Sequence, residues 1–129
     1  MTNERTFYRC EKCGNLVEMI NSSGVNPVCC GAPMTLLVPN STDASVAKHL
    51  PIISRDGNKV TVTIGAELHP MTPEHYIMWI ALAQGHSTKR VDLEPGGKPI
   101  VDFCVDDGPI SVYAYCNLHG LWASEQYME

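Results

Sequence analysis

The sequence lacks any long apolar run and any concentration of positive charge. No stretch approaches the roughly 20 apolar residues that a transmembrane helix needs, so we expect no membrane span. The first residues, MTNERTFYRC, lack the apolar segment and cleavage site of a secretory signal, which favours a cytoplasmic protein. The 9 Lys and Arg are outnumbered by 14 Asp and Glu, giving a formal net charge of −5. Because binding to a phosphate backbone depends on clustered Lys and Arg, we expect no nucleic-acid partner.

Internal repeats, low-complexity tracts and a convincing amphipathic helix are also missing. From residue 46 onward the chain instead consists of short apolar segments separated by turns, among them a hairpin turn at Asp56-Gly57-Asn58. The apolar run YIMWIALAQ fits either a helix or a buried strand, and its β-branched and aromatic residues favour a strand. Seven such segments in residues 46–129 predict an all-β fold, an antiparallel β-sandwich of immunoglobulin type.

The first 37 residues form a separate unit in this interpretation. Short β-like segments are expected at 6–9, 15–20 and 35–38, and the polar, turn-forming residues 38–45 then form a linker. A unit of residues 1–37 is too small for an adequate apolar core, so it needs a stabilising group such as a metal.

Cysteine spacing indicates which group that is. Four of the six cysteines lie in the first 30 residues, as the pair Cys10 and Cys13 and the adjacent pair Cys29 and Cys30. A disulfide framework is the alternative, but disulfides do not persist in a reducing cytoplasm, and bonding Cys29 to Cys30 would require a strained ring. We therefore predict four thiolates on one ion, zinc or iron. The adjacent pair is unusual for a zinc ribbon and favours iron.

A second group of metal-binding residue types lies in the C-terminal part. Cys116 and His119 form a Cys-x-x-His beside a glycine, which is weak on its own. His49, His69 and His75 stand at loop-like positions, where histidines are also common without any ligand role. Pro70 and Pro73 stiffen the segment that carries two of these histidines, which limits the entropy lost on binding a metal.

Together these five side chains exceed the four ligands of a structural zinc site. Imidazoles with a single thiolate suit a redox metal, iron above all, with the sulfur as a strong electron donor. Five protein ligands leave one of six octahedral positions open, which predicts binding of a small diatomic molecule.

Five motifs, taken in order along the chain, resemble desulfoferrodoxin, the two-iron class of superoxide reductase. The N-terminal part is similar to desulforedoxin through FYRCEKCGN and VCCGAPM, and the C-terminal part to the catalytic domain through AKHLPII, HPMTPEHYIMWI and YCNLHG. The resemblance implies a rubredoxin-like Fe(Cys)₄ centre followed by a second iron with four equatorial histidines and an axial cysteine. The ligands of the first centre are then Cys10, Cys13, Cys29 and Cys30; those of the second are His49, His69, His75, His119 and, axially, Cys116.

The resemblance also implies an activity and partners. The reaction is one-electron reduction of superoxide to hydrogen peroxide, a detoxification, with re-reduction of the iron through electron transport from a rubredoxin-like donor. The family is homodimeric. Catalytic roles are expected for Cys116, His119 and Lys48, the last as a cation that attracts the superoxide anion.

Position 47 departs from the family motif Glu-Lys-His, because Ala47 precedes Lys48 here. A methyl group cannot bind iron, so we expect solvent or an added anion at the sixth position of the oxidised site, with superoxide reduction retained. Cys104 and His86 remain outside both sites. The first is expected to pack as a small apolar residue on a strand, and the second to lie in an exposed turn.

Two other functions fit the residues without the resemblance. One is a zinc-ribbon protein whose β-domain binds a partner protein, and the other is a pure electron carrier. Visible absorption separates iron from zinc, and one peroxide formed per superoxide consumed separates a reductase from a carrier.

Overall fold

The computed structural model describes residues 3–126, which divide into two compact units. The smaller unit comprises Glu4–Val38, and the larger begins at Pro39 and also includes Asn3. The polar segment after Pro39 is attached to β12 (Gly120–Gln126) of the larger unit by Asn40, whose side chain accepts a hydrogen bond from the Ala123 N–H at 2.9 Å and donates one to the Ala123 carbonyl at 3.1 Å.

The smaller unit consists of two small antiparallel β-structures. Three strands form a sheet in the order β2-β1-β5, and a two-stranded hairpin of β3 and β4 carries the adjacent cysteines. The strands are β1 Phe7–Arg9, β2 Leu16–Glu18, β3 Val28–Cys29, β4 Ala32–Pro33 and β5 Thr35–Leu36. Its buried cluster holds Tyr8, Cys10 and Met34, and Phe7 and Leu37 are the other buried apolar residues, so the unit has little apolar core of its own.

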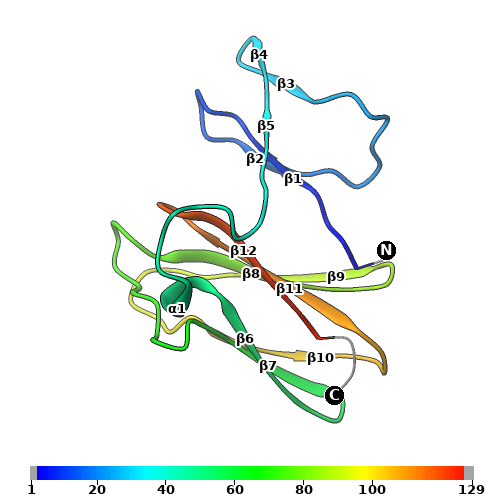
Figure 1. Ribbon diagram of the computed structural model, residues 1–129, viewed down its shortest axis with the longest axis vertical. Helices are drawn as coiled ribbons and strands as arrows, with labels where there is room; N and C mark the ends of the chain where they lie inside the picture. Colours follow the sequence, from blue (N-terminus) through cyan, green and yellow to red (C-terminus); the bar gives the residue numbers. More distant parts are fainter. Residues whose placement is uncertain (1–2, 127–129) are drawn as a thin grey trace. The chain divides into compact units, whose positions relative to one another are not determined.

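The larger unit is a sandwich of two antiparallel sheets (Figure 1). One sheet has three strands in the order β10-β7-β6, and the other has four in the order β12-β11-β8-β9. The bounds are β6 Pro51–Asp56, β7 Lys59–Ile64, β8 Ile77–Gln84, β9 Ser87–Asp92, β10 Ile100–Cys104, β11 Ile110–Cys116 and β12 Gly120–Gln126. The predicted all-β fold, with a small cysteine-bearing unit followed by seven strands in a sandwich, is confirmed.

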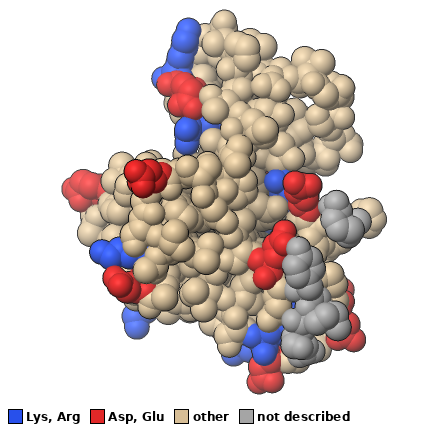
Figure 2. Space-filling model, in the orientation of Figure 1, with Lys and Arg blue, Asp and Glu red and all other residues tan. Residues whose placement is uncertain are grey.

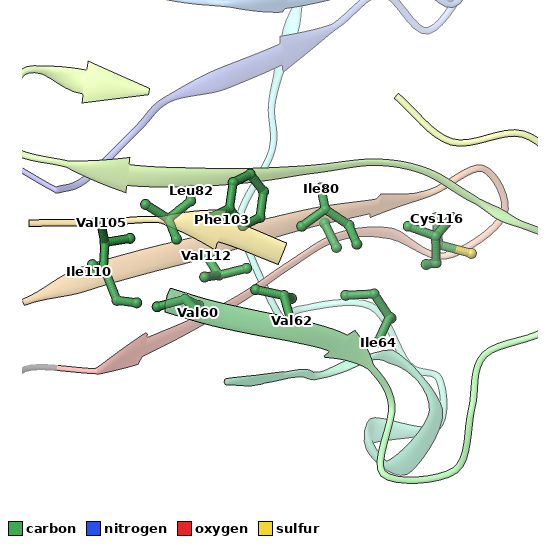
Figure 3. Close-up of a cluster of buried hydrophobic side chains, with 12 residues drawn as sticks. Val60, Val62, Ile64, Ile80, Leu82, Phe103, Val105, Ile110, Val112 and Cys116 are labelled. Carbon is green, nitrogen blue, oxygen red and sulfur yellow. The ribbon is translucent and has the colours of Figure 1, made fainter. Parts of the chain in front are cut away.

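Alternating apolar residues of four strands form the core between the sheets. On β7, for example, Val60, Val62 and Ile64 are fully buried, whereas Thr61 and Thr63 between them are partly exposed. Complete burial of each such side chain contributes about 1.5–3 kcal/mol. Figure 3 shows this cluster, with Cys116 at one end and its sulfur directed away from the aliphatic side chains. The core therefore ends at a thiol.

Two features of the sandwich differ from the expectations. Val46–His49 forms a one-turn helix, α1, where we expected strands to begin; four residues are too few to show helical periodicity. Cys104 lies on a strand as predicted, but its predicted burial is wrong because it is exposed. Val101 and Phe103 point toward the core, so the strand period of two places Cys104 on the outer face. His86 lies in an exposed turn, as predicted.

One end of the sandwich gathers three segments that are distant in sequence. Helix α1, the loop at 65–76 between β7 and β8, and the turn at 117–119 between β11 and β12 all lie at this end, on the left in Figure 1. These segments and the last residue of β11, Cys116, carry the five candidate ligands of the second group. The topology thus assembles the site.

The surface shows scattered basic residues, and the described part of the chain has little helix. On the face in Figure 2, Lys and Arg occur singly or beside acidic residues rather than as a broad patch. Among the described residues the helix content is the four-residue α1, and no helix is long and apolar enough to cross a membrane.

Candidate metal centres

The first centre begins with a turn that directs two thiols to one point. Cys10 directly follows β1, and the Gly14 N–H donates a hydrogen bond to the Cys10 carbonyl at 2.9 Å. The Cys13 N–H points at the Cys10 sulfur over 3.4 Å. Gly14 has a φ of +83°, a conformation that glycine adopts without strain. This local geometry is what a Cys-x-x-Cys-Gly sequence provides for a metal.

A tight hairpin explains how adjacent cysteines can join the same group. Cys29 ends β3 and pairs with Ala32 of β4, so Cys30 and Gly31 form a two-residue loop. Both loop residues have positive φ values, 55° and 75°, as a type I′ hairpin requires. A left-handed conformation at a non-glycine residue costs about 1–3 kcal/mol and occurs preferentially at functional sites.

The four sulfurs are spaced as ligands of one ion. They all lie within 4.8 Å of one another, with 3.6 Å between Cys13 and Cys29 and 3.9 Å between Cys29 and Cys30. A tetrahedron with metal–sulfur bonds of about 2.3 Å has edges of about 3.8 Å. Disulfide bonds are about 2.05 Å long, and all six cysteines are free thiols.

Two thiols of this centre have pKa values shifted in opposite directions. The pKa of Cys10 is lowered to about 6, chiefly by the backbone N–H groups of Cys13 and Lys12. The pKa of Cys30 is raised to about 12, chiefly by its contacts with the sulfurs of Cys13 and Cys10. Four thiolates so close together repel one another unless a cation lies between them. The donor set therefore fits a metal ion.

The imidazole groups of four histidines are arranged in a circle in the second centre, which we call the ring of histidines. Successive centroids are 4.6 Å apart from His49 to His69, 4.6 Å from His69 to His75, 5.1 Å from His75 to His119 and 4.9 Å from His119 back to His49. The diagonal from His49 to His75 is longer, 6.1 Å. This is the arrangement of four rings around one central point.

Cys116 adds a sulfur to this ring of histidines. Its Sγ lies 3.9 Å from Nδ1 of His119. One ligand atom from each of His49, His75, Cys116 and His119 lies within 4.8 Å of the others. His69 joins the group through its ring contacts with His49 and His75.

Backbone carbonyls determine which ring nitrogen of two histidines is available. Nδ1 of His49 lies 2.7 Å from the Ser45 carbonyl, and Nδ1 of His69 lies 2.7 Å from the Pro70 carbonyl. A carbonyl only accepts hydrogen bonds, so each Nδ1 carries the proton and each Nε2 has a free lone pair. Nε2 of His49 lies 3.1 Å from Nδ1 of His119. Two ligands at right angles on bonds of about 2.1 Å are about 3.0 Å apart.

Buried nitrogen atoms without partners support a metal at this point. Among the described residues, Nε2 of His69 and Nε2 of His75 are buried and make no hydrogen bond. Such unsatisfied polar atoms are rare in native proteins and call for an ion or ligand. The residues present therefore fit a metal ion with imidazole and thiolate ligands.

Burial sets the protonation of the ligands. It lowers the pKa of His49 and His75, and it lowers the pKa of His69 to about 4. Burial likewise raises the pKa of Cys116, while the backbone N–H groups of Leu118 and His119 act in the opposite direction. The imidazoles of His49, His69 and His75 are therefore neutral and available for a metal at neutral pH, and the sulfur becomes a thiolate when a cation offsets its burial.

Trp122 supports this site and was not predicted from the sequence. Trp122 is 1% exposed and stacks on His49, with 4.9 Å between ring centroids and 22° between planes. Its Nε1–H donates to the His119 carbonyl at 3.1 Å. One indole thus contacts two histidines of the ring. A tryptophan three residues after a candidate ligand was the available signal.

Helix α1 places Lys48 and His49 beside the loop at 65–67. The Glu67 N–H donates to the Ala47 carbonyl at 2.9 Å, and the Gly65 N–H donates to the Leu50 carbonyl at 3.1 Å. A Cβ on Gly65 would lie 2.3 Å from the Glu67 carbonyl oxygen and 2.6 Å from that of Lys48. Only glycine allows this approach, at a φ of +91°.

We expect Gly65→Ala to lower the free energy of unfolding by about 2–6 kcal/mol, because backbone strain and overpacking each cost about 1–3 kcal/mol. It should also displace α1 and weaken metal retention in the second centre. Gly57→Ala is the matched control, since Gly57 has a φ of +63° but open space around its Cβ position. Denaturant unfolding of both variants checks this prediction, and equal losses of stability would contradict it.

Comparisons with known proteins identify the family. The desulfoferrodoxin family model matches residues 41–125, and the model for the desulfoferrodoxin N-terminal domain matches residues 2–37. A desulfoferrodoxin homolog of Archaeoglobus fulgidus is 44% identical over 124 residues, which cover 96% of this chain and 99% of the relative. A superoxide reductase of Pyrococcus horikoshii is 34% identical over 108 residues, which cover 69% of this chain and 94% of the relative.

Solved structures agree with these relatives. The crystal structure of the superoxide reductase from Treponema pallidum matches with a TM-score of 0.74 and 31% identity, covering 94% of this chain and 98% of that one. The two groups of metal-binding side chains correspond to the two iron centres of desulfoferrodoxin, which confirms the resemblance inferred from the motifs. This chain belongs to the desulfoferrodoxin family.

Proposed function

We propose that this protein is a superoxide reductase, which takes one electron and two protons per superoxide and releases hydrogen peroxide. The observation that carries this function is the ring of four imidazoles with the Cys116 thiol beside it. Superoxide reductases among the relatives support the same conclusion.

The proposed ligands follow from the two groups of side chains. Cys10, Cys13, Cys29 and Cys30 hold the first iron, and the four histidines with Cys116 hold the second. Iron in the second centre supplies the electron by cycling between its ferrous and ferric states. The proposed catalytic residues of the chain are Cys116, His119 and Lys48.

The surrounding chain controls the ligands. The Ser45 and Pro70 carbonyls keep the protons of His49 and His69 on Nδ1, away from the centre. The N–H groups of Leu118 and His119 favour the thiolate of Cys116, whose electron density favours electron release from the centre. The ring of histidines is only partly covered, since His75 and His119 are half-buried and Leu118 is exposed. Water can therefore deliver the two protons.

Lys48 is proposed to attract the anionic substrate. It is exposed on α1 directly before His49, and its charge acts on both His49 and His75. Within residues 3–126 Lys48 forms no ion pair, so its charge is available to an incoming anion. In a protein with a net charge of −5, such a local cation raises the encounter rate of an anion.

Lys48→Ala is expected to lower the second-order rate constant for superoxide by about tenfold at low ionic strength, the lower end of the range for electrostatic steering. The dependence of the rate on salt should weaken in the same variant, and Lys48→Arg should retain both. Lys59→Ala makes the same change in net charge at the opposite end of β7 and is the control. Pulse radiolysis at several salt concentrations measures these rates. Equal rates for the two alanine variants would contradict the role of Lys48.

Further parts of the proposal concern partners and compartment. We propose a small rubredoxin-like protein as the electron donor and a reducing, cytoplasmic location, supported by the six free thiols. We propose a homodimer, supported by Val17 and Leu36, which are exposed on either side of Tyr8 in the sheet of the smaller unit. Light scattering of the iron-loaded protein tests the dimer.

Without a carboxylate at Ala47, we expect solvent or an added anion at the sixth position of the oxidised iron.

The test of the function is a stoichiometry. Iron-loaded protein with a reduced donor is expected to form one hydrogen peroxide per superoxide consumed, with one electron taken from the donor. Dismutation forms about half a peroxide per superoxide and consumes no donor. Metal analysis should find two irons per chain, and zinc in the second centre or no donor oxidation would overturn the proposal.

A further inference from the structure

The side chain of Asn117 joins the loop that carries His75 to the end of β11, where Cys116 lies. Its Oδ1 accepts a hydrogen bond from the Tyr76 N–H at 2.9 Å, and its Nδ2 donates to the Glu74 carbonyl at 3.0 Å. Its own backbone N–H donates to the Tyr76 carbonyl at 3.2 Å. Glu74 and Tyr76 are the two neighbours of His75 in the sequence. One amide thus holds His75 from both sides.

A bulge in the sheet explains why a side chain is needed here. Tyr115 pairs with Trp79 but Cys116 pairs with Ile77, so Met78 is an extra residue on β8. In a regular antiparallel pair the next step would exchange two backbone hydrogen bonds between residues 117 and 76. One of them is present, and Oδ1 of Asn117 replaces the backbone carbonyl in the other. The chain can then turn toward His119 while the pairing extends one step further.

His75 depends on this support more than two other histidines of the ring. Carbonyls hold the Nδ1 atoms of His49 and His69 at 2.7 Å. Among the described residues, the ring of His75 forms no hydrogen bond, and its Nε2 is one of the unpartnered buried atoms. Its orientation therefore rests on its backbone, which bonds to Thr72 on one side and is flanked by the bonds of Asn117.

We propose that Asn117 is a positioning residue that holds His75 against Cys116 and so slows the loss of metal from the second centre. This proposal rests on the proposed function for the identity of the metal as iron. Loss of partners that orient metal ligands typically costs 10–100-fold in metal affinity.

Gln84 provides a matched control at the other end of β8. Its Oε1 accepts from the Asp106 N–H at 2.9 Å, and its Nε2 donates to the Asp106 carbonyl at 2.8 Å. This amide makes the same two kinds of hydrogen bond as Asn117, but it lies at the end of β8 far from the ligands. Both side chains are partly exposed, so replacement by alanine should leave the protein folded.

The experiment compares Asn117→Ala, Gln84→Ala and the unmodified protein, each loaded with iron. Loss of iron to a chelator is followed through the thiolate-to-ferric absorption of each centre, since the centres differ in thiolate number and hence in spectrum. We expect similar decreases in melting temperature for the two variants. Only Asn117→Ala should lose iron from the second centre about 10–100-fold faster and show a shifted absorption there.

Equal rates of iron loss in the two variants would overturn the positioning role. Asn117→Asp keeps the oxygen that faces Tyr76 but has no N–H for the Glu74 carbonyl, and it replaces the alanine variant if that one does not fold. It should lose iron faster than the unmodified protein, and an unchanged rate would also overturn the proposal. Failure of the unmodified protein to bind iron in the second centre would instead count against the proposed function.

Discussion

Replacing Cys116 with alanine is expected to lower the rate of superoxide reduction by at least about 100-fold. Losing a residue that only orients a metal ligand costs up to about 100-fold in activity, and losing a ligand itself should cost no less. The substitution leaves four imidazoles and removes the thiolate of the second centre. A thiolate bound to iron would donate more electron density to it than an imidazole would. The iron should therefore release its electron less readily, and its reduction potential should rise.

The position of Cys116 makes this expectation specific. The residue is fully buried at the end of the sandwich core, where β11 ends, and backbone N–H groups of the following turn favour its thiolate. A buried thiolate without a cation is unfavourable, so this sulfur and a metal require each other. Rapid mixing with superoxide and titration of the iron potential measure the two effects.

Cys104→Ala is the matched control for this variant. Cys104 is the other cysteine outside the N-terminal group, and it is exposed on β10. Its replacement also removes one thiol but should change neither the rate nor the potential. A Cys116→Ala protein that reduces superoxide as fast as Cys104→Ala would show that the thiolate is not needed.

Much of the fold follows from local patterns in the sequence. Alternation of apolar residues in KVTVTI and the turn at Gly57-Asn58 predict β7 and its hairpin with β6, because strand period and turn residues act locally. The run YIMWIALAQ has no clear period, yet its residue types correctly favoured the strand that became β8. Cys104 could have been placed as well, because Val101 and Phe103 already mark the inward face of β10.

The candidate site was less accessible from the sequence, because its support comes from contacts that are distant along the chain. Spacing alone brought together Cys116 and His119, whereas the ring of histidines depends on where α1 and the loop at 65–76 meet. The Asn117 amide bonds to Tyr76 and Glu74, which precede it by 41 and 43 positions in the sequence. An asparagine in a turn gives no sign of such distant partners. The left-handed φ of Cys30 likewise follows only from the hairpin.

Replacing Cys13 with alanine is expected to unfold the smaller unit while leaving the sandwich intact. Cys13 is exposed, so its loss removes a ligand with little loss of packing. The buried cluster of this unit consists of Tyr8, Cys10 and Met34, with Cys29 packed against it, so two of the metal-binding cysteines belong to the core itself. Structural metals in small domains contribute about 10–16 kcal/mol of apparent binding free energy, and most of it should be lost.

Amide hydrogen exchange of the full-length protein measures this effect unit by unit. In Cys13→Ala the amides of β1, the central strand of the smaller sheet, should exchange at nearly unprotected rates, whereas those of β8 and β11 stay protected. Cys116→Ala is the reciprocal control, because it leaves the first centre complete and should leave exchange in β1 unchanged. Since 35 residues with so few buried apolar side chains cannot hold three strands together unaided, protected β1 amides without metal would mean that something other than the metal stabilises this unit.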